Sequence, residues 1–479
     1  MKNKYFKRVI CVLLVIALAL GGLWYANRVL VMKRVDGILT MQDFYAQPQG
    51  TVDVLLVGNS HSGINIDTAE LWTEYGISSY NLWGGVQPLW NSYHFIVEAL
   101  KYQQPKVICL EVTATVSDYE YSEEQNQIKN TAGMKLSKNK FEAVRVSAPK
   151  ERWFNLLLGL PLYHSRFDEL EQKDFEHFPW SAGLENFKGS YLLYGAGNYR
   201  HESAEGVTAR REIMDKELDY LNRIIALCKD NGIPLMLLKT PSVEKTDEQE
   251  IFNTVADIAD ENGLPFVNMN LMESELSVTA QDYSTDRHMN GSGARKVSHW
   301  LGAYLRENFG VEDHRGDERY ISWDINACNV NDDYLTAITE NSDYFAELRR
   351  NGRAALVVKN EPWEDNEEYR MLVKEMESIG LPGLAAAENS KDAFFVNDTA
   401  SGVNAPASVN GDTITFSLDG ETLTVSFEYQ NVVFAGKKLT WFGASEMVMI
   451  VYDTQTNKVV DTVSFSSANH YALQRADEK

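Results

Sequence analysis

An apolar run that ends in a polar turn, near the start of the chain, is the feature that most constrains the fold. Residues 52–57 read Val-Asp-Val-Leu-Leu-Val, and Gly58-Asn59-Ser60 follows directly. A short apolar run bounded by glycine is typical of a buried parallel strand. In open α/β sheets, ligands bind at the carboxyl ends of such strands. Ser60 is therefore expected at a strand-to-helix junction where a reaction could take place.

The same pattern recurs along the first part of the chain and predicts the fold class. The expected strands cover residues 52–57, 79–82, 106–112, 234–238 and 265–268, and the expected helices cover residues 90–102, 209–231, 247–262 and 294–307. Alternating strands and helices give a parallel sheet with helices on both faces, a three-layer α/β sandwich. We expect this domain to occupy residues 51–312.

A histidine motif far downstream supplies the chemical partner for the serine. His288 stands within Asp286-Arg287-His288-Met289-Asn290. A serine hydroxyl is a weak nucleophile until a nearby base takes its proton, and a histidine oriented by a carboxylate is the usual base. Asp286 is the favoured acid, because an adjacent loop residue can turn back onto the imidazole, and Asp282 is the alternative. Taken alone, Ser60 would read as a helix N-cap.

Three blocks together resemble the SGNH (GDSL) hydrolase superfamily. They are Gly58-Asn59-Ser60, the stretch Tyr80-Asn81-Leu82-Trp83-Gly84-Gly85-Val86-Gln87-Pro88, and Asp286-x-His288-Met289-Asn290-x-x-Gly293-Ala294-x-Lys296. The last block is similar to the cell-envelope branch, which includes the D-alanine transfer protein of teichoic-acid synthesis and the alginate acetylation proteins. The resemblance covers roughly residues 52–309.

The resemblance implies roles for particular residues. It makes Ser60 the nucleophile, His288 the base, and the backbone N–H groups of Ser60 and of Gly84 or Gly85 the oxyanion donors, with the Asn59 side chain as a further donor. His61 and Asn290 are expected to contact substrate or pack beside it.

The chain departs from the family pattern in two places. Thr285 occupies the position, three residues before the histidine, where many members carry aspartate. The third block, Gly-x-Asn-Asp, is absent, and Lys239-Thr240-Pro241-Ser242 stands in its place.

The implied activity is that of a serine esterase or O-acyltransferase acting on acyl esters of a cell-surface glycan or teichoic-type polymer. Transfer is favoured, beside a membrane-bound O-acyltransferase (MBOAT-type) partner. The alternative is a non-catalytic binding or assembly protein on a degenerate SGNH fold. No metal or organic cofactor is expected, since the other histidines show no metal-ligand spacing and the four cysteines are scattered.

The N-terminus carries a membrane signal. Residues 1–8 are rich in lysine and arginine, and residues 9–27 are uncharged, which is close to the roughly 20 residues that span a bilayer. The flanking cations place residues 1–8 in the cytoplasm and the bulk of the chain outside the cell membrane, as a single-pass protein with a stalk at 28–50. The alternative is a cleaved signal peptide, for which Ala17-Leu18-Ala19 offers a cleavage pattern.

Charge excludes one class of partner. The formal net charge is -23, with acidic residues spread along the chain. Nucleic-acid binding needs a basic surface, so we expect no nucleic-acid partner.

The segment 113–208 interrupts the strand–helix alternation after the third strand. It is rich in aromatic residues, namely Trp153, Tyr163, Phe167, Phe175, Phe178, Trp180, Tyr191, Tyr194 and Tyr199. Two interpretations remain open: a lid or substrate platform at the edge that carries Ser60, or a structural insertion that packs on the fold.

The character of the chain changes again near residue 318. Amphipathic helices are expected at residues 343–351 and 367–379, and strands at residues 354–359, 413–418, 423–429, 438–441, 447–452 and 459–464. The spacing of turns predicts a β-rich α+β sandwich domain over residues 318–470. The sequence pattern of its strands resembles that of the interleukin-like (ILEI-type) domain. This resemblance implies a non-enzymatic module for carbohydrate or protein contact.

Overall fold

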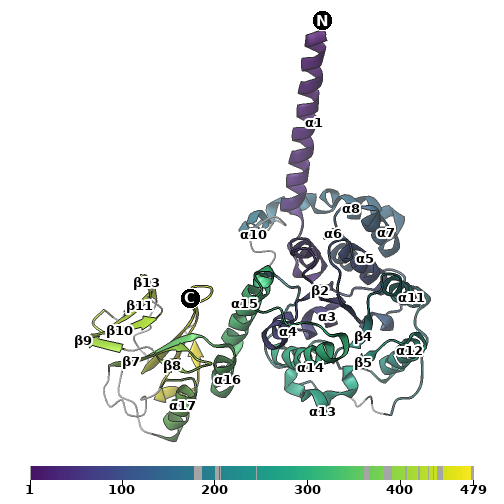
Figure 1. Ribbon diagram of the computed structural model, residues 1–479. Coiled ribbons are helices and arrows are strands. Elements are labelled where there is room, and N and C mark those ends of the chain that lie inside the picture. Colours follow the sequence, from purple (N-terminus) through teal and green to yellow (C-terminus); the bar gives the residue numbers. More distant parts are fainter. Residues whose placement is uncertain are drawn as a thin grey trace. The chain divides into compact units, whose positions relative to one another are not determined.

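The computed structural model describes residues 2–176, 186–199, 204, 206–243, 245–360, 366–381, 391–404, 407–418, 421–429, 431–434, 436–439 and 446–475. These form two compact units, Met1–Ala327 and Cys328–Lys479 (Figure 1). Two of the expected aromatic residues of the insertion, Phe178 and Trp180, and the end of the expected strand at 438–441 lie outside the described residues.

A parallel sheet of five strands forms the centre of the first unit. Its strands are β1 (Val54–Gly58), β2 (Ser79–Trp83), β3 (Val107–Glu111), β4 (Leu235–Lys239) and β5 (Phe266–Asn268), in the order β2-β1-β3-β4-β5. Val54 pairs with Ser79 on one side and with Val107 on the other. This is the order of a doubly wound fold: from β1 the chain first adds β2 on one side and then adds β3, β4 and β5 on the other side. The predicted α/β class is confirmed.

Helices cover both faces of this sheet. On one face lie α4 (Thr68–Tyr75) and α14 (Gly291–Phe309), and on the other α5 (Leu89–Ala99) and α11 (Asp215–Asp230), while α12 (Thr246–Asn262) follows β4 (Figure 1). Alternate residues of each strand serve the two faces: Leu56 and Cys109 join a core with Leu301 of α14. Because both faces are covered, β1 to β4 are buried along their whole length. Apolar runs predicted this burial for β1, β3 and β4, whereas β2 carries Ser79 and Asn81.

The first unit continues past residue 312, the expected end of its domain. Trp323 is fully buried, packs against Trp72 and Tyr320, and donates from Nε1 to the carbonyl of Ser79 at 3.1 Å. Trp323 stands near the start of α15 (Ile321–Ala337). Residues up to Ala327 therefore belong to this core.

The N-terminal helix α1 (Lys2–Leu30) projects from the first unit (Figure 1). Among the described residues, the stretch Tyr5–Leu30 is the one helix that is long and apolar enough to cross a membrane, judged by length and composition. Its side chains are exposed as far as Tyr25, whereas Val29 in its last turn is buried. The foot of α1 is thus built into the unit.

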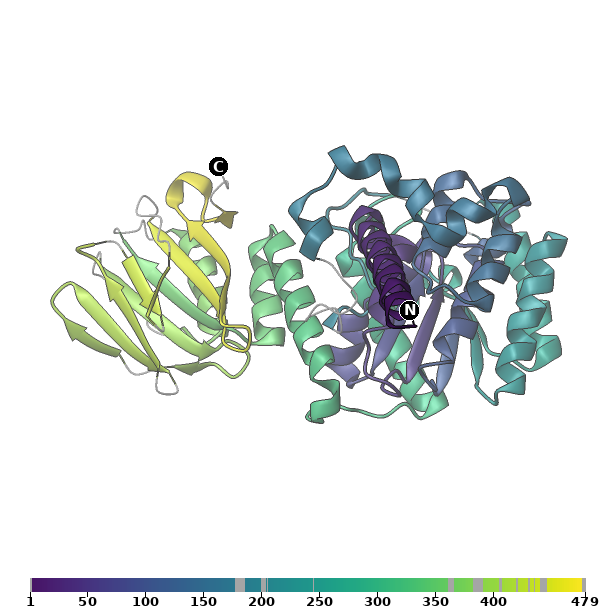
Figure 2. The ribbon, with the colours of Figure 1, turned by 90° about the horizontal axis from the view of Figure 1, so that it is seen from above.

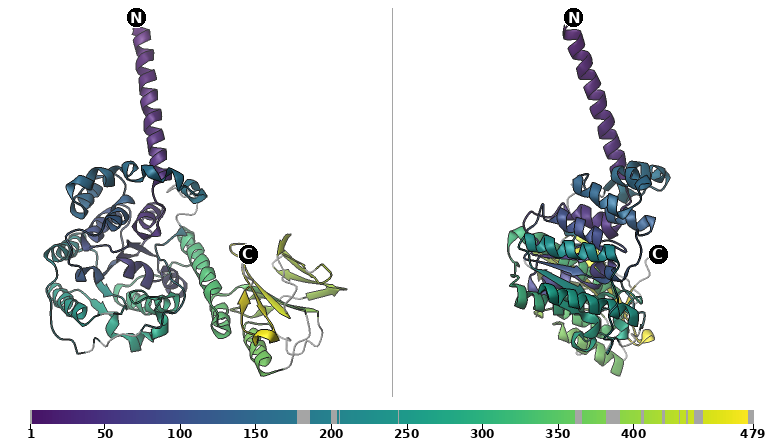
Figure 3. Two further views of the ribbon diagram at one scale, coloured as in Figure 1. Left: turned by 180° about the vertical axis from the view of Figure 1, so that it is seen from behind. Right: turned by 90° about the vertical axis from the view of Figure 1, so that its right-hand side faces the viewer.

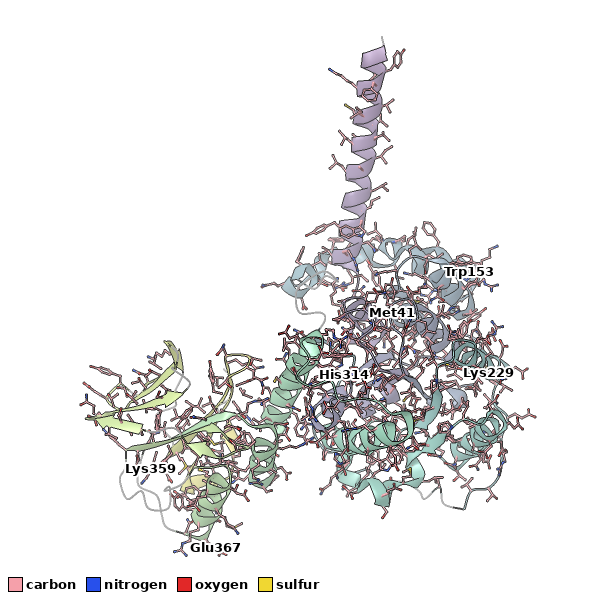
Figure 4. All side chains as sticks on the ribbon, viewed as in Figure 1. Met41, Trp153, Lys229, His314, Lys359 and Glu367 are labelled. Atoms are coloured by element: carbon pink, nitrogen blue, oxygen red, sulfur yellow. The ribbon has the colours of Figure 1, made fainter. Side chains whose placement is uncertain are left out.

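The described part of the insertion divides into two portions. Its short helices are α6 (Glu124–Ala132), α7 (Lys138–Ser147), α8 (Trp153–Leu158), α9 (Leu160–Tyr163) and α10 (Gln172–Glu176). Several of them gather around the foot of α1, which Figure 2 shows almost end-on and Figure 3 from two further sides. Trp153 lies in this group, whereas Met41 lies inside the unit (Figure 4). Residues 186–199, in contrast, run beside α3 (Ser60–Asn65), where Tyr191 donates from its backbone to Gly63.

The second unit is an α/β/β sandwich. Its first sheet has the order β16-β15-β14-β6-β7-β8 and its second the order β13-β12-β11-β10-β9. The strands are β6 (Ala354–Lys359), β7 (Asp392–Asp398), β8 (Val403–Asn404), β9 (Ala407–Asn410), β10 (Thr413–Leu418), β11 (Glu421–Ser426), β12 (Asn431–Phe434), β13 (Lys437–Leu439), β14 (Met447–Asp453), β15 (Lys458–Phe465) and β16 (Gln474–Arg475).

Two apolar layers hold these sheets. Side chains such as Ile450 and Val425 pack between the two sheets, and Val357 packs on the opposite face against α16 (Asn341–Asn351) and α17 (Glu367–Ser378). The β-rich α+β class is confirmed.

The first unit also contains two short helices, α2 (Thr40–Phe44) and α13 (Glu273–Leu276).

Candidate active site

Ser60 stands at the junction between β1 and α3, at the carboxyl edge of the sheet. Asn59 caps the helix, with its Oδ1 accepting from the N–H of His61 at 2.9 Å. Glycine is required at the end of the strand, because a Cβ on Gly58 would lie 2.7 Å from Cβ of Glu111. A Cβ on Gly63 would overlap the ring of Trp83, so glycine also lets α3 pack against β2. These small residues set the position of Ser60.

The structure places His288 beside Ser60. Nε2 of the imidazole lies 2.8 Å from Oγ of Ser60, although the two residues stand 228 positions apart in the chain. A tight hairpin presents the imidazole: Tyr283 bridges to Met289, and the backbone of Ser284 donates to the His288 carbonyl at 3.0 Å. The contact is within the range in which a base accepts a proton from a nucleophile.

Asn65 fastens the segments that meet at this contact. Its Oδ1 accepts from the backbone of Met289 at 3.0 Å. Its Nδ2 donates to Oγ1 of Thr240 at 3.1 Å and to the carbonyl of Pro241 at 3.0 Å. Asn65 is fully buried, and one side chain therefore ties α3, the histidine hairpin and the loop after β4 together.

Thr285, and not a carboxylate, contacts the second nitrogen of the imidazole. Its Oγ1 lies 3.3 Å from Nδ1 of His288. The same oxygen accepts from the backbone N–H groups of Arg287 at 3.2 Å and of His288 at 3.0 Å. The threonine thus occupies the place that an orienting acid takes in a catalytic triad.

Neither candidate aspartate reaches the imidazole by a hydrogen bond in the described part of the chain. Asp286 is exposed at the tip of the hairpin, and its charge raises the pKa of His288 from a distance. Asp282 is buried and accepts from Thr279 at 2.7 Å, from Ser292 at 2.9 Å and from Lys296 at 2.8 Å. Asp282 therefore holds the start of α14 to the loop before it.

The bonds to Thr285 bear on the tautomer of His288. A hydroxyl has two acceptor lone pairs and one hydrogen to donate. With both lone pairs engaged by N–H groups, the hydroxyl hydrogen is directed to Nδ1, which favours the tautomer that carries its proton on Nε2. A general base for Ser60 needs the opposite tautomer. The resting site is a serine–histidine pair whose base is held less firmly than in a triad with a carboxylate.

Backbone donors are present at this edge of the sheet. Among the described residues, the N–H groups of Ser60 and Gly85 make no turn or loop hydrogen bond. Gly58 pairs with Trp83 across β1 and β2, so the turn that begins at Gly84 directly follows the neighbouring strand. Donors at this edge could bind an oxyanion.

The turn after β2 is strained. Val86 has a φ of 50°, a left-handed conformation that is costly for a β-branched residue. Asn130 of α6 supports the turn by donating from Nδ2 to the carbonyl of Gly85 at 3.1 Å. Contacts such as this one hold the strained conformation in place, and strained residues of this kind cluster in functional loops.

His61 lies next to His288, with ring centroids 5.4 Å apart. Burial, together with the charge of Lys239 and the neighbouring His288, lowers the pKa of His61 well below its usual range. Burial thus favours the neutral form of His61. Nδ1 of His61 is buried and has no hydrogen-bond partner among the described residues.

Asn290 is engaged in the fold. Its Oδ1 caps α14 by accepting from Gly293 at 3.1 Å, and its Nδ2 donates to the carbonyls of Gln281 at 2.7 Å and Gly195 at 3.3 Å. The side chain is thus bonded within the protein and not open toward Ser60.

Two buried ionisable residues, Lys239 and Glu111, lie at the same edge of the sheet. Lys239 is fully buried and donates to the carbonyl of Thr240 and to Oγ of Ser242. Burial raises the pKa of Glu111, and the Lys239 ammonium opposes that rise. Lys239 stands in the stretch that replaces the third block, but no motif in the sequence indicates a role for Lys239, Glu111 or Asn65. A lysine that ends an apolar strand, as Lys239 does, is the feature of the sequence that could have indicated a buried charge here.

No cluster of three or more His, Cys, Asp or Glu side chains able to hold a metal ion occurs within the described ranges. Fold and site together define an α/β protein with a serine–histidine pair at the carboxyl edge of a parallel sheet.

The chain matches no protein-family model and no curated protein. Among solved structures, it is similar to a crystal structure described as a "putative acylhydrolase" from Bacteroides fragilis NCTC 9343, with 12% identity over 55% of this chain and 91% of that one and a TM-score of 0.27. It is also similar to a gut microbial diltiazem-metabolizing enzyme, with 10% identity over 80% of this chain and 59% of that one and a TM-score of 0.16. Similarity this low bears on neither fold nor function.

Proposed function

We propose that this protein is a membrane-anchored serine esterase or O-acyltransferase that acts on acyl esters of a cell-surface glycan or teichoic-type polymer. The observation that carries the proposal is the 2.8 Å contact between Oγ of Ser60 and Nε2 of His288. It occurs at the sheet edge where α/β proteins bind ligands. The N–H of Ser60, which makes no turn or loop hydrogen bond to a described residue, suits a developing oxyanion, and the turn at Gly84-Gly85 follows the neighbouring strand.

The reaction would proceed in two halves. Oγ of Ser60 attacks the ester carbonyl, and Nε2 of His288 takes the hydroxyl proton. The carbon–oxygen bond of the ester then breaks, and His288 returns that proton to the leaving alkoxide. In the second half, water or a sugar hydroxyl attacks the acyl-serine, His288 accepts the proton of the attacking group, and Ser60 regains it as the acyl group departs.

During these steps Nδ1 of His288 must carry a proton. Thr285 can accept that hydrogen bond only if its hydroxyl rotates away and one of its backbone N–H bonds loosens. We infer that imidazole orientation limits the rate of this site. Asp286 contributes by its charge, and Asp282 contributes through the fold. Both remain weaker candidates for the acid than their sequence positions suggested.

The composition of α1 supports a membrane location with the reaction on the outer side. Apolar side chains from Val9 to Leu20 are exposed in the structure, and a bilayer would cover them. Lys2, Lys4, Lys7 and Arg8 precede them, which suits a cytoplasmic N-terminus and an outward-facing site. An MBOAT-type partner that supplies the acyl group fits this topology and a transfer reaction.

A second candidate function is a non-catalytic surface binding or assembly protein. The observation that favours it is Thr285 at the position of the acid, since loss of an orienting carboxylate lowers turnover by on the order of 10⁴ in a triad.

Incubation of the purified protein with a chromogenic acetyl ester tests the choice. We expect hydrolysis by the wild type and none by Ser60→Ala. Ser62→Ala is the matched control, because Ser62 lies on the same helix and bonds to Asn81 at 2.8 Å, away from His288. A fluorophosphonate should label Ser60 in the wild type and in the control. Equal hydrolysis by wild type and Ser60→Ala, or no labelling of a folded wild type, would refute the enzyme and favour the binding protein.

A further inference from the structure

A cavity of about 340 Å³ opens where the foot of α1 meets the rest of the first unit. Its polar lining residues are Asn27, Arg28, Gln42, Tyr45, Lys135, Lys140 and Tyr163. Three of these residues are cations, and no aspartate or glutamate lines the cavity. In a chain with a formal net charge of -23, a cationic cavity without acidic residues favours an anionic ligand.

Lys140 is the most telling of the three cations. The residue is 6% exposed, and its ammonium has no ion-pair or hydrogen-bond partner among the described residues. Burial lowers its pKa to about 8. Removing an ammonium group from water without a partner is costly, so buried lysines are normally paired. An anion in the cavity would supply the missing partner.

Two further buried groups in the cavity lack hydrogen bonds. Oη of Tyr163 and Oδ1 of Asn27 have no partner in the described part of the chain. A tyrosine hydroxyl can donate to a phosphate oxygen, and an amide oxygen can accept from a ligand hydroxyl. Buried polar groups are normally satisfied, and their conjunction with Lys140 points to a ligand that has both an anionic and a hydroxyl group.

The rest of the cavity and its surroundings are apolar. Trp24, Met134 and Leu157 are among the lining residues. Around them, the insertion exposes large apolar side chains, including Leu136 at 70%, Phe154 at 63% and Phe167 at 71%. They belong to the segments that gather around the foot of α1 (Figures 1 and 2). Exposed apolar groups concentrated beside a membrane helix are suited to contact with a lipid surface.

We propose that this cavity binds the phosphate headgroup of an anionic phospholipid from the outward-facing leaflet of the membrane that α1 enters. The proposal rests on the proposed function in one respect, the retention of α1 as an anchor. Lys140, Lys135 and Arg28 surround the phosphate, Tyr163 donates to it, and the acyl chains leave along Trp24 and the exposed apolar side chains. The insertion thereby seats the first unit on the membrane, in addition to any contact that it makes beside Ser60.

The volume and position of the cavity agree with such a ligand. Small-molecule sites occupy about 300–1,000 Å³, which accommodates a headgroup but not a whole lipid. Trp24 and Arg28 stand at the end of the apolar stretch of α1, where aromatic and cationic side chains lie at headgroup depth.

The test uses the full-length chain, purified with α1, in nanodiscs of phosphatidylcholine with or without phosphatidylglycerol. Phosphatidylglycerol retained after exchange into detergent is counted by native mass spectrometry, and the melting temperature is measured in both nanodiscs. The variant is Lys140→Met, which keeps side-chain length and removes the charge. The matched control is Lys138→Met, an exposed lysine on the same helix that does not line the cavity.

We expect Lys140→Met to retain at least about tenfold less phosphatidylglycerol than wild type, in line with the loss of a charge-assisted bond, and Lys138→Met to retain as much as wild type. Phosphatidylglycerol should raise the melting temperature of wild type but not of Lys140→Met. Lys140→Met should itself melt no lower than wild type in phosphatidylcholine alone, because an unpaired buried charge has gone.

Equal retention by wild type and Lys140→Met would overturn the proposal. The proposal would also be overturned if soluble glycerol phosphate raised the melting temperature of the wild type as much as phosphatidylglycerol does. That result would show that the cavity binds a soluble anion and not a lipid. The intact mass of the cellular protein tests the anchor separately: cleavage after Ala19 would disprove anchorage, whatever the outcome of lipid binding. Ester hydrolysis enters none of these measurements, so failure of the enzyme and failure of the lipid site are distinguishable.

Discussion

The hydroxyl oxygen of Thr285 lies 3.3 Å from Nδ1 of His288, on the side of the imidazole opposite Ser60. That oxygen also accepts two backbone N–H bonds, from Arg287 and His288. The long contact and the competition for lone pairs leave the imidazole without a strong acceptor at Nδ1. The identity of one side chain in the hairpin therefore controls how well Ser60 can be activated.

Replacing Thr285 by aspartate should increase ester hydrolysis. A carboxylate reaches one bond farther than the hydroxyl and accepts from Nδ1, which fixes the tautomer that the reaction needs. We expect kcat to rise by about tenfold or more. Thr285→Asn, of the same size but uncharged, is the control and should bring no gain. If Thr285→Asp folds and reacts no faster than wild type, orientation of the imidazole does not limit the rate.

The pH profile should respond to the two charges beside His288 in opposite directions. Burial lowers the pKa of His288 from its usual 6.5, the charge of Asp286 raises it, and that of Arg287 lowers it. The base must be neutral, so activity falls as pH drops through this pKa, and wild type should stay active below pH 6.5.

The corresponding variants make that expectation specific. Arg287→Gln should move the acid limb of kcat/KM to higher pH, and Asp286→Asn should move it to lower pH. Because Asp286 has no hydrogen bond to the imidazole in the described structure, we expect its loss to reduce turnover at neutral pH by less than about tenfold. A far larger loss for Asp286→Asn would identify it as the orienting acid after all.

Stability should depend on pH through Glu217. Its carboxylate accepts from the N–H of Leu89 at 2.9 Å, at the start of α5, where Pro88 offers no side-chain cap. Burial raises the pKa of Glu217 from 4.5 to about 8. The folded carboxyl binds more protons than the unfolded one between these values, so its contribution to stability is present below pH 4.5 and is lost as pH rises to about 8.

Glu217→Gln keeps an acceptor of the same size and removes this titration. We expect the variant to melt a few degrees above wild type at pH 8.5 and to approach it at pH 5, as measured by differential scanning calorimetry. Glu212→Gln, at an exposed position, is the control. A Glu217→Gln variant that is less stable than wild type at pH 8.5 would show that the carboxylate is needed in its charged form.

Truncation should separate the chemistry from the second unit. A chain that ends at Ala337 keeps the buried Trp323, and we expect it to fold and to hydrolyse a small ester. A chain that ends at Val311 loses Trp323 and its contacts with Trp72 and Ser79, which should cost about 3–5 kcal/mol of unfolding free energy. Denaturant unfolding measures the difference. Loss of ester hydrolysis in a folded chain ending at Ala337 would mean that the second unit contributes to the site.

Local patterns in the sequence were enough to place Ser60 and to give the class of both units. Continuous apolar runs predicted the buried strands, and Gly58-Asn59-Ser60 marked the junction after β1, because strand burial and helix capping depend on neighbouring residues. The same reasoning found the strands β10, β14 and β15 of the second unit and missed β7 and β12, although Thr399-Ala400-Ser401-Gly402 follows β7 and Ala435-Gly436 follows β12.

Only the tertiary structure decided which side chain contacts the imidazole opposite Ser60, and that side chain is Thr285 and not an aspartate. The pairing of Tyr283 with Met289 sets which hairpin side chains face His288, and it turns Thr285 inward while Asp286 is exposed at the tip. Spacing along the chain cannot distinguish these outcomes. The roles of Asn65 and Lys140 were likewise hidden, because each depends on contacts, or on a lack of contacts, with segments far away in sequence. The sequence by itself determined the elements and the edge where chemistry could occur, and the packing between distant segments decided which side chains meet there.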